Sequence, residues 1–272
     1  MEWCELTSRK NETVLLAASL SEKKQRRKTA SFCFEGVKLL GEALTSGVTL
    51  RAVFATEKAR AQYADLLAGI PDTVRKYAVT DEVYRKFSEE NAPQGIFCIA
   101  EELDKSVKIT TIYMQDQNDP SQRMLLCDGM RDPGNVGTVI RCAAAMGVGR
   151  LVFSSDCADL YHPKTVRGAM GALFRQHIDL TDDMEAYVRS LREGGRRVFA
   201  AALRDDAKTL GTFPLLPTDC FLVGNEGHGL SDALCGACDG AVRIPMEPGS
   251  ESYNAAMAAT LLMWEGYRQS LS

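Results

Sequence analysis

Apolar residues follow two patterns along this chain: short continuous runs, and longer segments with apolar residues three or four positions apart. Continuous runs of this kind are typical of buried strands, and the wider spacing is typical of helices that pack on one side. The alternation of the two patterns predicts an α/β fold. The expected strands are Leu50–Ala55, Thr73–Val79, Gly95–Ala100, Met124–Cys127, Leu151–Ser154, Val198–Leu203, Cys220–Val223 and Ala241–Ile244. The expected helices are Phe32–Leu44, Ala59–Leu67, Glu82–Ser88, a helix over residues 136–147 that Asn135 caps, one within Tyr161–Phe174, and Ala255–Trp264.

A polar stretch divides these elements into two series. Residues 1–105 predict a small α/β domain without a catalytic constellation, which leaves binding as its expected role. Residues 106–122 form the expected linker, because Asp116–Gln122 is rich in turn-forming residues. Residues 123–272 alternate strands and helices and predict a second domain with a mostly parallel sheet.

Two strands of the second domain end in loops that suit a ligand. Cys220–Val223 is followed by Gly224–Gly227, and Ala241–Ile244 by Pro245–Gly249. Open α/β sheets bind ligands beyond the carboxyl ends of their strands, and glycine lets the backbone approach a ligand closely. Ordinary strand-to-helix turns are the alternative. The loops also carry small polar and acidic side chains, namely Asn225, Glu226, Ser250, Ser252 and Asn254.

The helix expected at Ala255–Trp264 contains no charged residue. A helix that is apolar on all sides must be covered on all sides. One side can cover the sheet, and a partner subunit is the simplest cover for the other. A central helix in a large monomeric core is the alternative.

Positive charge gathers near the N-terminus, although the chain of 272 residues has a net charge of −4. The stretch Lys23–Lys28 has five positive side chains in six residues, and such runs bind the phosphates of nucleic acids. A solvated helix face is the alternative. The candidate RNA-binding residues are Arg9, Lys23, Lys24, Arg26, Arg27, Lys28, Lys164 and Arg167.

Several classes of protein are disfavoured. No apolar stretch reaches the roughly 20 residues of a membrane span, and the N-terminus lacks a signal core. Nine scattered cysteines suit a reducing cytoplasm. The lone Cys235–Cys238 pair and three dispersed histidines do not predict a metal site. The glycines of Gly224–Gly229 stand in the wrong order for a dinucleotide loop, so a nucleotide-dependent oxidoreductase is a remote alternative.

Three motifs, in order, resemble those of the SpoU/TrmH family of SPOUT RNA 2′-O-ribose methyltransferases. They are Asp132–Arg141, Phe221–Ser231, and Ile244–Met246 followed by Ser252–Asn254. The segments Phe34–Gly36 and Ala92–Ile96 are similar to the family's substrate-binding domain. Three departures are modest: Tyr253 stands where leucine is usual, His228 lies inside the second motif, and the length of Glu247–Ser250 varies in the family.

The resemblance implies a SPOUT domain with a mostly parallel sheet and a trefoil knot. It also implies an N-terminal substrate-binding domain of ribosomal-protein-like α/β fold, and a homodimer joined through the knot and the C-terminal helix. S-adenosylmethionine is the implied methyl donor, without a metal. The residues implied to bind it are Leu203, Gly224, Ile244, Met246, Ser252 and Asn254.

The resemblance further implies that Arg141 carries the chemistry. Asn135, Glu226, Ser252 and Asn254 would hold Arg141 and the donor in place. The family proposal makes this arginine the base, but a guanidinium is always protonated in proteins. We therefore expect Arg141 to hold a phosphate and stabilise the developing alkoxide. Ribosomal RNA is the expected substrate; transfer RNA, or an inactive RNA-binding protein of the same fold, are the alternatives.

Overall fold

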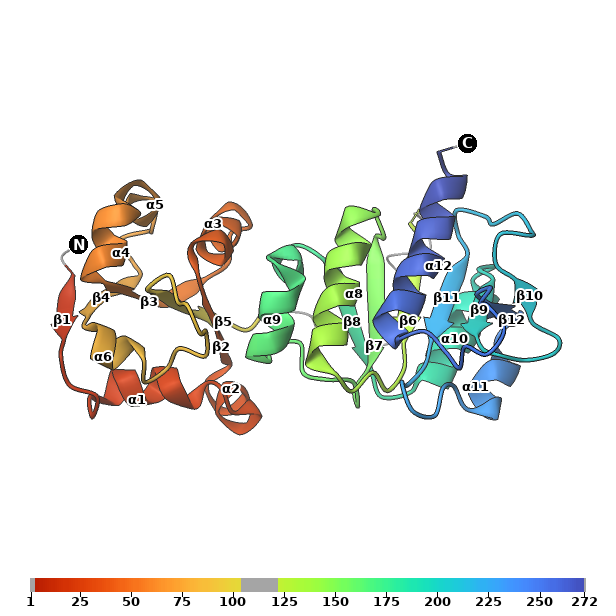
Figure 1. Ribbon diagram of the computed structural model, residues 1–272, viewed down its shortest axis with the longest axis horizontal. Coiled ribbons are helices and arrows are strands. Elements are labelled where there is room, and N and C mark those ends of the chain that lie inside the picture. The colour runs from red at the N-terminus through yellow and green to blue at the C-terminus, as the bar shows by residue number, and fades with distance from the viewer. Residues whose placement is uncertain (1–2, 104–121, 272) are drawn as a thin grey trace. The chain divides into compact units, whose positions relative to one another are not determined.

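The structure is a computed structural model that describes residues 3–103 and 122–271. The chain forms two compact units (Figure 1). The first contains the N-terminal residues up to 104 together with Asp159–Arg175, and the second contains the rest. The predicted linker, 106–122, lies almost wholly outside the described residues, so the predicted domain boundaries remain predictions.

The first unit is built on a mixed sheet of five strands. Its order is β1-β4-β3-β5-β2; β1, β4 and β3 are parallel, and β5 runs antiparallel to β3 and β2. The strands are β1 (Cys4–Leu6), β2 (Ser31–Glu35), β3 (Leu50–Thr56), β4 (Arg75–Val79) and β5 (Ile96–Glu101). The helices are α1 (Glu12–Ser19), α2 (Lys23–Thr29), α3 (Val37–Thr45), α4 (Glu57–Gln62), α5 (Ala64–Ala68), α6 (Asp81–Tyr84) and α9 (Pro163–Ala169), followed by a 3₁₀ turn at Ala172–Phe174.

Helices cover both faces of this sheet. Figure 1 shows α3, α4 and α5 on one face and α1 and α6 on the other. The α1 face buries a cluster in which Val14 and Val83 pack against Phe54 and Phe97. Phe32 of β2 stacks near Tyr161, at 4.9 Å between ring centroids, so the segment 159–175 packs on this unit.

The first helix expected in this unit is partly wrong. The expected helix Phe32–Leu44 is a strand, β2, followed by a helix, α3. Phe32, Cys33 and Phe34 are all buried, because β2 pairs antiparallel with β5 and both of its faces are covered. Gly36 then turns the chain at φ +104°, a conformation that favours glycine, and the helical spacing begins only after it.

The second unit has a parallel sheet of seven strands, in the order β10-β12-β9-β11-β6-β7-β8. The strands are β6 (Met124–Cys127), β7 (Arg150–Ser154), β8 (His177–Thr181), β9 (Val198–Ala201), β10 (Lys208–Thr209), β11 (Cys220–Val223) and β12 (Gly240–Arg243). The helices are α8 (Pro133–Ala145), α10 (Met184–Glu193), α11 (Asp232–Ala237) and α12 (Ala255–Gln269). The parallel sheet is as predicted, whereas β8, β10, α10 and α11 were not predicted. The trefoil knot remains a prediction.

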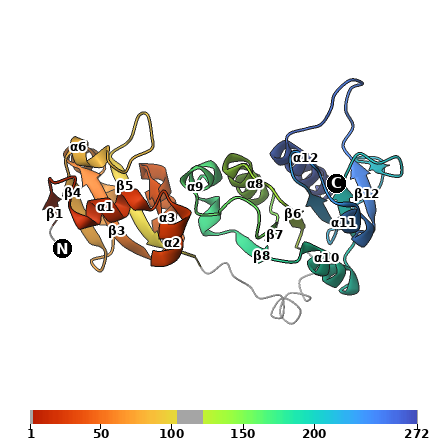
Figure 2. The same ribbon diagram turned by 90° about the horizontal axis from the view of Figure 1, so that it is seen from below.

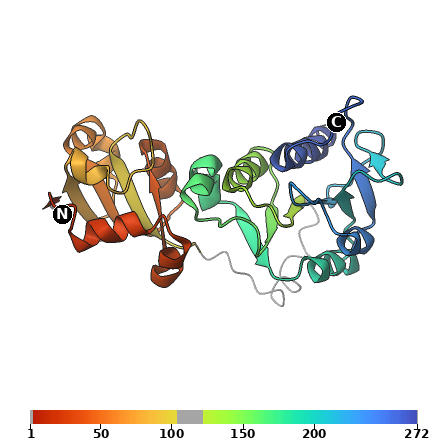
Figure 3. The same ribbon diagram turned by 60° about the horizontal axis from the view of Figure 1, so that its bottom comes forward.

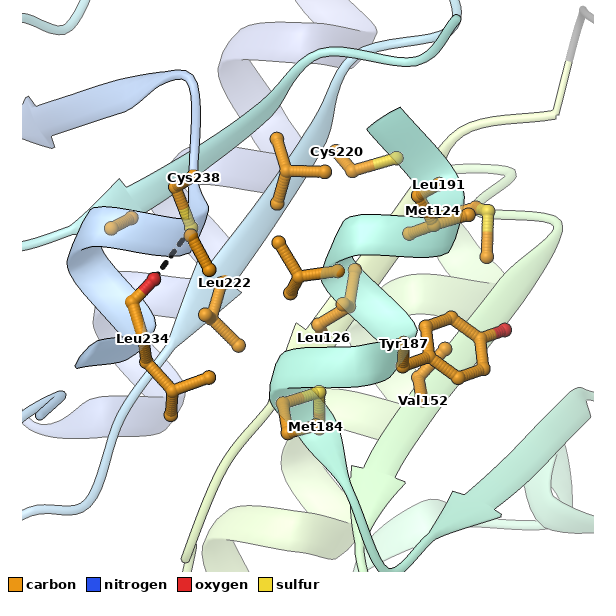
Figure 4. Close-up of a cluster of buried hydrophobic side chains, with 14 residues drawn as sticks. Met124, Leu126, Val152, Met184, Tyr187, Leu191, Cys220, Leu222, Leu234 and Cys238 are labelled. Carbon is orange, nitrogen blue, oxygen red and sulfur yellow. Dashed lines mark hydrogen bonds between the residues drawn. The ribbon is translucent and has the colours of Figure 1, made fainter. Parts of the chain in front are cut away.

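The helices form a layer on each face of this sheet. In Figures 2 and 3, α8 and α12 lie on one side of the strands and α10 and α11 on the other. Figure 4 shows the core beneath α10 and α11, where Met184, Tyr187 and Leu234 pack on Leu126 and Leu222 of the strands.

The helix α12 is longer than predicted and is covered on one side only. Ala259 and Leu262 are buried, whereas Met257 is 51% and Trp264 is 48% exposed. The side of α12 that carries Met257 and Trp264 forms an apolar stripe that its own chain leaves uncovered. This agrees with the expectation that a second surface is needed to cover the helix. Among the described residues, no helix combines the length and apolarity needed to cross a membrane.

Candidate active site

A cavity of about 410 Å³ opens where three neighbouring parallel strands end. Its walls are the segments that follow β9, β11 and β12, together with the start of α12. Because the carboxyl ends of parallel strands meet at one edge of a sheet, residues far apart in sequence gather here. Five of the six predicted donor-binding residues line it: Leu203, Gly224, Ile244, Met246 and Ser252.

The loop after β11 is closed by a short antiparallel bridge between Asn225 and Gly229. A Cβ at Gly224 would lie 2.5 Å from the backbone carbon of Gly229, so only glycine fits there. Asn225 fixes the same loop: its Oδ1 accepts from Gly227 N at 2.8 Å, and its Nδ2 donates to Gly129 O at 2.6 Å. The glycines of this motif therefore serve close backbone packing in the loop.

A directed chain of hydrogen bonds joins the three sequence motifs. Asn254 caps α12, and its Oδ1 accepts from the N–H groups of Ala256 and Met257. Its Nδ2 donates to Asn135 Oδ1 at 3.1 Å. Asn135 Nδ2 in turn donates to Glu226 Oε1 at 2.8 Å. The cap requires the oxygen of the Asn254 amide to face the helix, so its nitrogen faces Asn135. Asn135 must therefore turn its own oxygen to Asn254 and its nitrogen to Glu226.

Glu226 is the acceptor at the end of this chain. Burial alone raises the pKa of Glu226, but hydrogen bonds from Asn135 and from the backbone N–H groups of Arg131 and Asp132 outweigh burial and lower it. The bond from Arg131 N to Glu226 Oε2 is 3.2 Å long. Glu226 is therefore a carboxylate at neutral pH, held at the rim of the cavity.

The predicted cap of α8 is wrong. The N-cap is Asp132, whose Oδ1 accepts from Gly134 N at 2.6 Å and Asn135 N at 3.0 Å. Pro133, the residue after this cap, suits the first helical turn. The helix therefore begins three residues before the expected start at residue 136. Asn135 lies within that first turn, and its side chain is thereby free to bond Glu226 and Asn254.

Arg141 lies two turns along α8 from the hydrogen-bonded chain and is exposed. It is outside the described residues that line the cavity of its own chain. No ion-pair partner for it occurs among the described residues. Its guanidinium is therefore available to an external group.

Several lining residues were not predicted to be part of the site. They include His228, Asp232 and Cys235, whereas Arg204 lies in the segment after Val198–Leu203 that was expected as a further wall. Arg204 pairs with Asp206 at 3.1 Å and with Asp232 at 3.6 Å, which holds the β9 loop near the start of α11. The order of strands β9, β11 and β12 brings these residues together, and sequence spacing does not reveal that order.

Most of the predicted RNA-binding residues are exposed. Lys23, Lys24, Arg27 and Lys28 lie on the open side of α2. The others are Arg9, which is 3.8 Å from Glu82, and Lys164 and Arg167 of α9.

Arg26 requires a correction, because its side chain is buried, with the residue only 1% exposed. Its guanidinium donates to Leu20 O at 2.8 Å, to Ser21 O at 2.7 Å and to Asp159 Oδ2 at 2.8 Å. The basic residues on both sides of Arg26 made it look like part of an exposed basic surface, although its side chain is buried. Arg26 is therefore not available to bind RNA.

Within the described residues, no cluster of histidine, cysteine or acidic side chains could hold a metal ion. All nine cysteines are free thiols, and burial raises the pKa of Cys220 and Cys238 to about 12. These thiols are therefore inert core residues at neutral pH.

The comparisons with known proteins agree with the three motifs. A model of an MRM3-like substrate binding domain matches residues 11–98. The 23S rRNA (guanosine(2553)-2'-O)-methyltransferase RlmP of Bacillus subtilis (strain 168) is 31% identical over 96% of this chain and 98% of its own length. A mitochondrial rRNA methyltransferase 3 of Xenopus laevis is 30% identical over 96% of this chain and 74% of its own length.

A solved structure agrees in fold over nearly the whole chain. The AdoMet-bound rRNA methyltransferase from Sinorhizobium meliloti matches with a TM-score of 0.85 and 28% identity, covering 98% of each chain. The model of the SpoU rRNA methylase family matches residues 122–264, which include all three motifs. This chain therefore belongs to the SpoU rRNA methylase family.

Proposed function

We propose that this protein transfers a methyl group from S-adenosylmethionine to a ribose 2′-hydroxyl of ribosomal RNA. The observation that carries the proposal is the hydrogen-bonded chain Asn254–Asn135–Glu226, which joins all three motifs at the rim of one cavity. A relative that is named as a 23S rRNA 2'-O-methyltransferase and another that is named as an rRNA methyltransferase each align with 96% of this chain.

The cavity suits the methyl donor by size and by the chemistry of its walls. Its volume falls within the roughly 300–1,000 Å³ of ligand pockets. Leu203, Ile244 and Met246 would pack against the flat adenine, and the backbone of residues 252–254 would bind its polar edge. S-adenosylmethionine supplies a methyl group on a positively charged sulfur. The ionised Glu226 places negative charge in the wall of this cavity, which favours a bound cation.

Arg141 is the residue that we assign to the RNA side of the reaction. Its guanidinium remains protonated, so it holds the phosphate next to the target ribose and stabilises charge that develops on the 2′-oxygen. The proton of the hydroxyl passes to a phosphate oxygen or to water. Ser252 lines the same cavity and completes the polar set around the donor.

A second copy of the chain completes the protein. The open stripe of α12, with Met257 and Trp264 exposed, is the surface through which we expect a homodimer to form. Arg141 lies outside the lining of its own cavity, which suits a site that two subunits share. We expect the protein to act in the cytoplasm.

Selection of the RNA is assigned to the N-terminal domain, up to residue 105. Lys23, Lys24, Arg27 and Lys28 on α2, with Arg9, Lys164 and Arg167, would contact phosphates. Point substitutions test this better than deletion of the domain, because residues 159–175 pack with the first unit and deletion would uncover them.

The test is a map of ribose methylation across total RNA from cells that lack the protein and from cells that carry Asn135→Ala. We expect methylation of one ribosomal site to be lost without the protein and to be reduced with Asn135→Ala. Loss of a site in transfer RNA alone would replace the proposed substrate. Unchanged methylation everywhere, with normal donor binding by calorimetry, would favour the inactive RNA-binding alternative.

A further inference from the structure

The first unit contains a second cavity, of about 670 Å³, which is larger than the proposed donor site. It lies where β3 and β4 end and where the loop of residues 90–95 returns to β5. All of its walls belong to residues 56–95, which fall within the part of the chain that matches a substrate binding domain.

Close backbone contacts build this cavity. Thr56 N donates to Gly95 O at 3.0 Å, and Thr56 Oγ1 caps α4 by accepting from Ala59 N at 3.2 Å. A Cβ at Gly95 would lie 2.4 Å from Thr56 Oγ1, and Gly95 has φ +79°, so the position requires glycine. The loop is therefore held against the strand end, which makes the cavity a formed feature of the domain.

The walls carry hydrogen-bond donors and acceptors that have no partner within the described residues. Within the described residues, the amides of Gln62 and Asn91 have no hydrogen-bond partner. Gln94 Oε1 accepts from Val37 N at 2.9 Å, which leaves its amide nitrogen for another acceptor. Amide groups that offer both donors and acceptors match the edges of a nucleobase.

The walls also carry the ring of Tyr63, the cations Lys58 and Arg85, and the carboxylates of Asp81 and Glu90. Tyr63 is half-buried at the junction of α4 and α5. Lys58 and Arg85 are exposed, and neither has an ion-pair partner among the residues that the structure describes. Unstacked bases of RNA bind on aromatic rings, and their flanking phosphates bind lysine and arginine.

We propose that this cavity binds one unpaired nucleotide of the RNA substrate, next to the ring of Tyr63, with Lys58 and Arg85 on the adjacent phosphates. The inference rests on the proposed function for its RNA class. It adds a site that selects RNA by base, apart from the charge of α2. A free small molecule or a peptide would use the same polar walls, but neither requires both cations at the rim.

The test uses the full chain with deproteinised ribosomal RNA in a filter-binding assay at several salt concentrations. We expect Tyr63→Ala to weaken binding roughly tenfold, because one base stack is lost. Tyr63→Phe, which keeps the ring, is expected to bind as the wild type does. In the double variant Lys58→Ala/Arg85→Ala, the slope of log affinity against log salt concentration is expected to become less steep, by the amount that about two phosphate contacts contribute.

Lys86→Ala is the matched control, since Lys86 is an exposed neighbour outside the cavity lining. Thermal melting and calorimetry with S-adenosylmethionine confirm that each variant is folded. If Tyr63→Ala does not fold, Gln62→Ala/Asn91→Ala replaces it, because both residues are exposed. RNA that carries 4-thiouridine is expected to crosslink to the peptide that contains Tyr63.

Wild-type affinity and an unchanged salt dependence in all cavity variants would overturn the proposal. Binding of the RNA with crosslinks only outside residues 56–95 would also overturn it. A wild-type protein that binds S-adenosylmethionine but methylates no RNA would instead contradict the proposed function. In that case, a loss of RNA binding in Tyr63→Ala would still support the nucleotide cavity.

Discussion

Asn135 Nδ2 donates a hydrogen bond of 2.8 Å to Glu226 Oε1, although 91 positions separate the two residues in the sequence. The bond joins the start of α8 to the loop after β11. It leaves Asn135 Oδ1 facing Asn254, so one amide holds two loops of the site in register.

Replacing Asn135 by alanine removes the bonds to Glu226 and Asn254 together. A hydrogen bond to a charged group, once lost, costs about 1–3 kcal/mol. We therefore expect kcat/KM for methyl transfer to fall roughly 10- to 100-fold, with weaker donor binding in calorimetry. Ala145→Ser, an exposed change on the same helix, is the control. Unaltered kinetics in Asn135→Ala would show that the chain is not needed to assemble the site.

The lowered pKa of Glu226 links protein stability to pH. A carboxyl whose folded pKa is below its unfolded value stabilises the folded state above the unfolded pKa, here about 4.5, and loses that contribution as the pH falls through the folded pKa. Wild type should therefore be more stable than Glu226→Gln at pH 7, and the difference should shrink below pH 4.5. Urea unfolding at both pH values measures this. A difference that does not change with pH would contradict the assignment.

Substitutions at Arg141 separate the two possible roles of its guanidinium. If Arg141 stabilises charge, Arg141→Lys should keep partial activity, because lysine still offers a cation. Arg141→Ala should lose nearly all activity at unchanged donor affinity. Methyl transfer and calorimetry on both variants measure this. Equal and complete loss in both would count against charge stabilisation.

The exposed apolar stripe of α12 predicts a dimer interface, and one charged side chain placed in that stripe should prevent the dimer from forming. Trp264 is 48% exposed within the chain, and burying an unpaired carboxylate in an interface is strongly unfavourable. Trp264→Glu should therefore be monomeric in light scattering after size exclusion, and inactive. Leu15→Glu, at a similarly exposed apolar residue of α1, should keep the wild-type mass. A monomeric wild type would end this proposal.

Arg26 and Arg27 are neighbours on α2 with opposite expected roles. Loss of Arg26 leaves the carboxylate of Asp159 without its partner in a buried pair, so Arg26→Ala should destabilise the protein by about 3 kcal/mol. Arg27 is exposed, so Arg27→Ala should change stability by less than about 0.5 kcal/mol but weaken RNA binding. Denaturant unfolding and filter binding distinguish them. Equal stability of the two variants would contradict the buried role of Arg26.

Short-range patterns predicted much of the fold. Cys220–Val223 was predicted with the bounds that the structure has, and the glycines after it marked the cavity wall. These predictions succeeded because strand length and a glycine's close backbone approach are local properties. The prediction failed at Phe32–Leu44, where the residue pattern of a strand changes to that of a helix at Gly36. A window that spans both periods averages them into one helix.

The motifs also identified the family, and with it a proposed set of donor-binding residues. Sequence by itself determined which residue types were available: glycines for close loops, amides and a carboxylate for a polar rim, and an uncharged helix for a further surface. It could not assign Asp132 rather than Asn135 as the helix cap, because both are good caps and only the backbone geometry chooses between them.

Tertiary structure decided which of these residues meet. The strand order β12-β9-β11-β6 places the ends of β9, β11 and β12 around one cavity, and α8 and α12 then bring Asn135 to Glu226 and Asn254. It also turned Arg26 inward, away from its basic neighbours. The physical reason is that burial and long-range hydrogen bonds depend on packing between distant segments. The spacing of apolar residues in the sequence shows only which side of each segment is apolar.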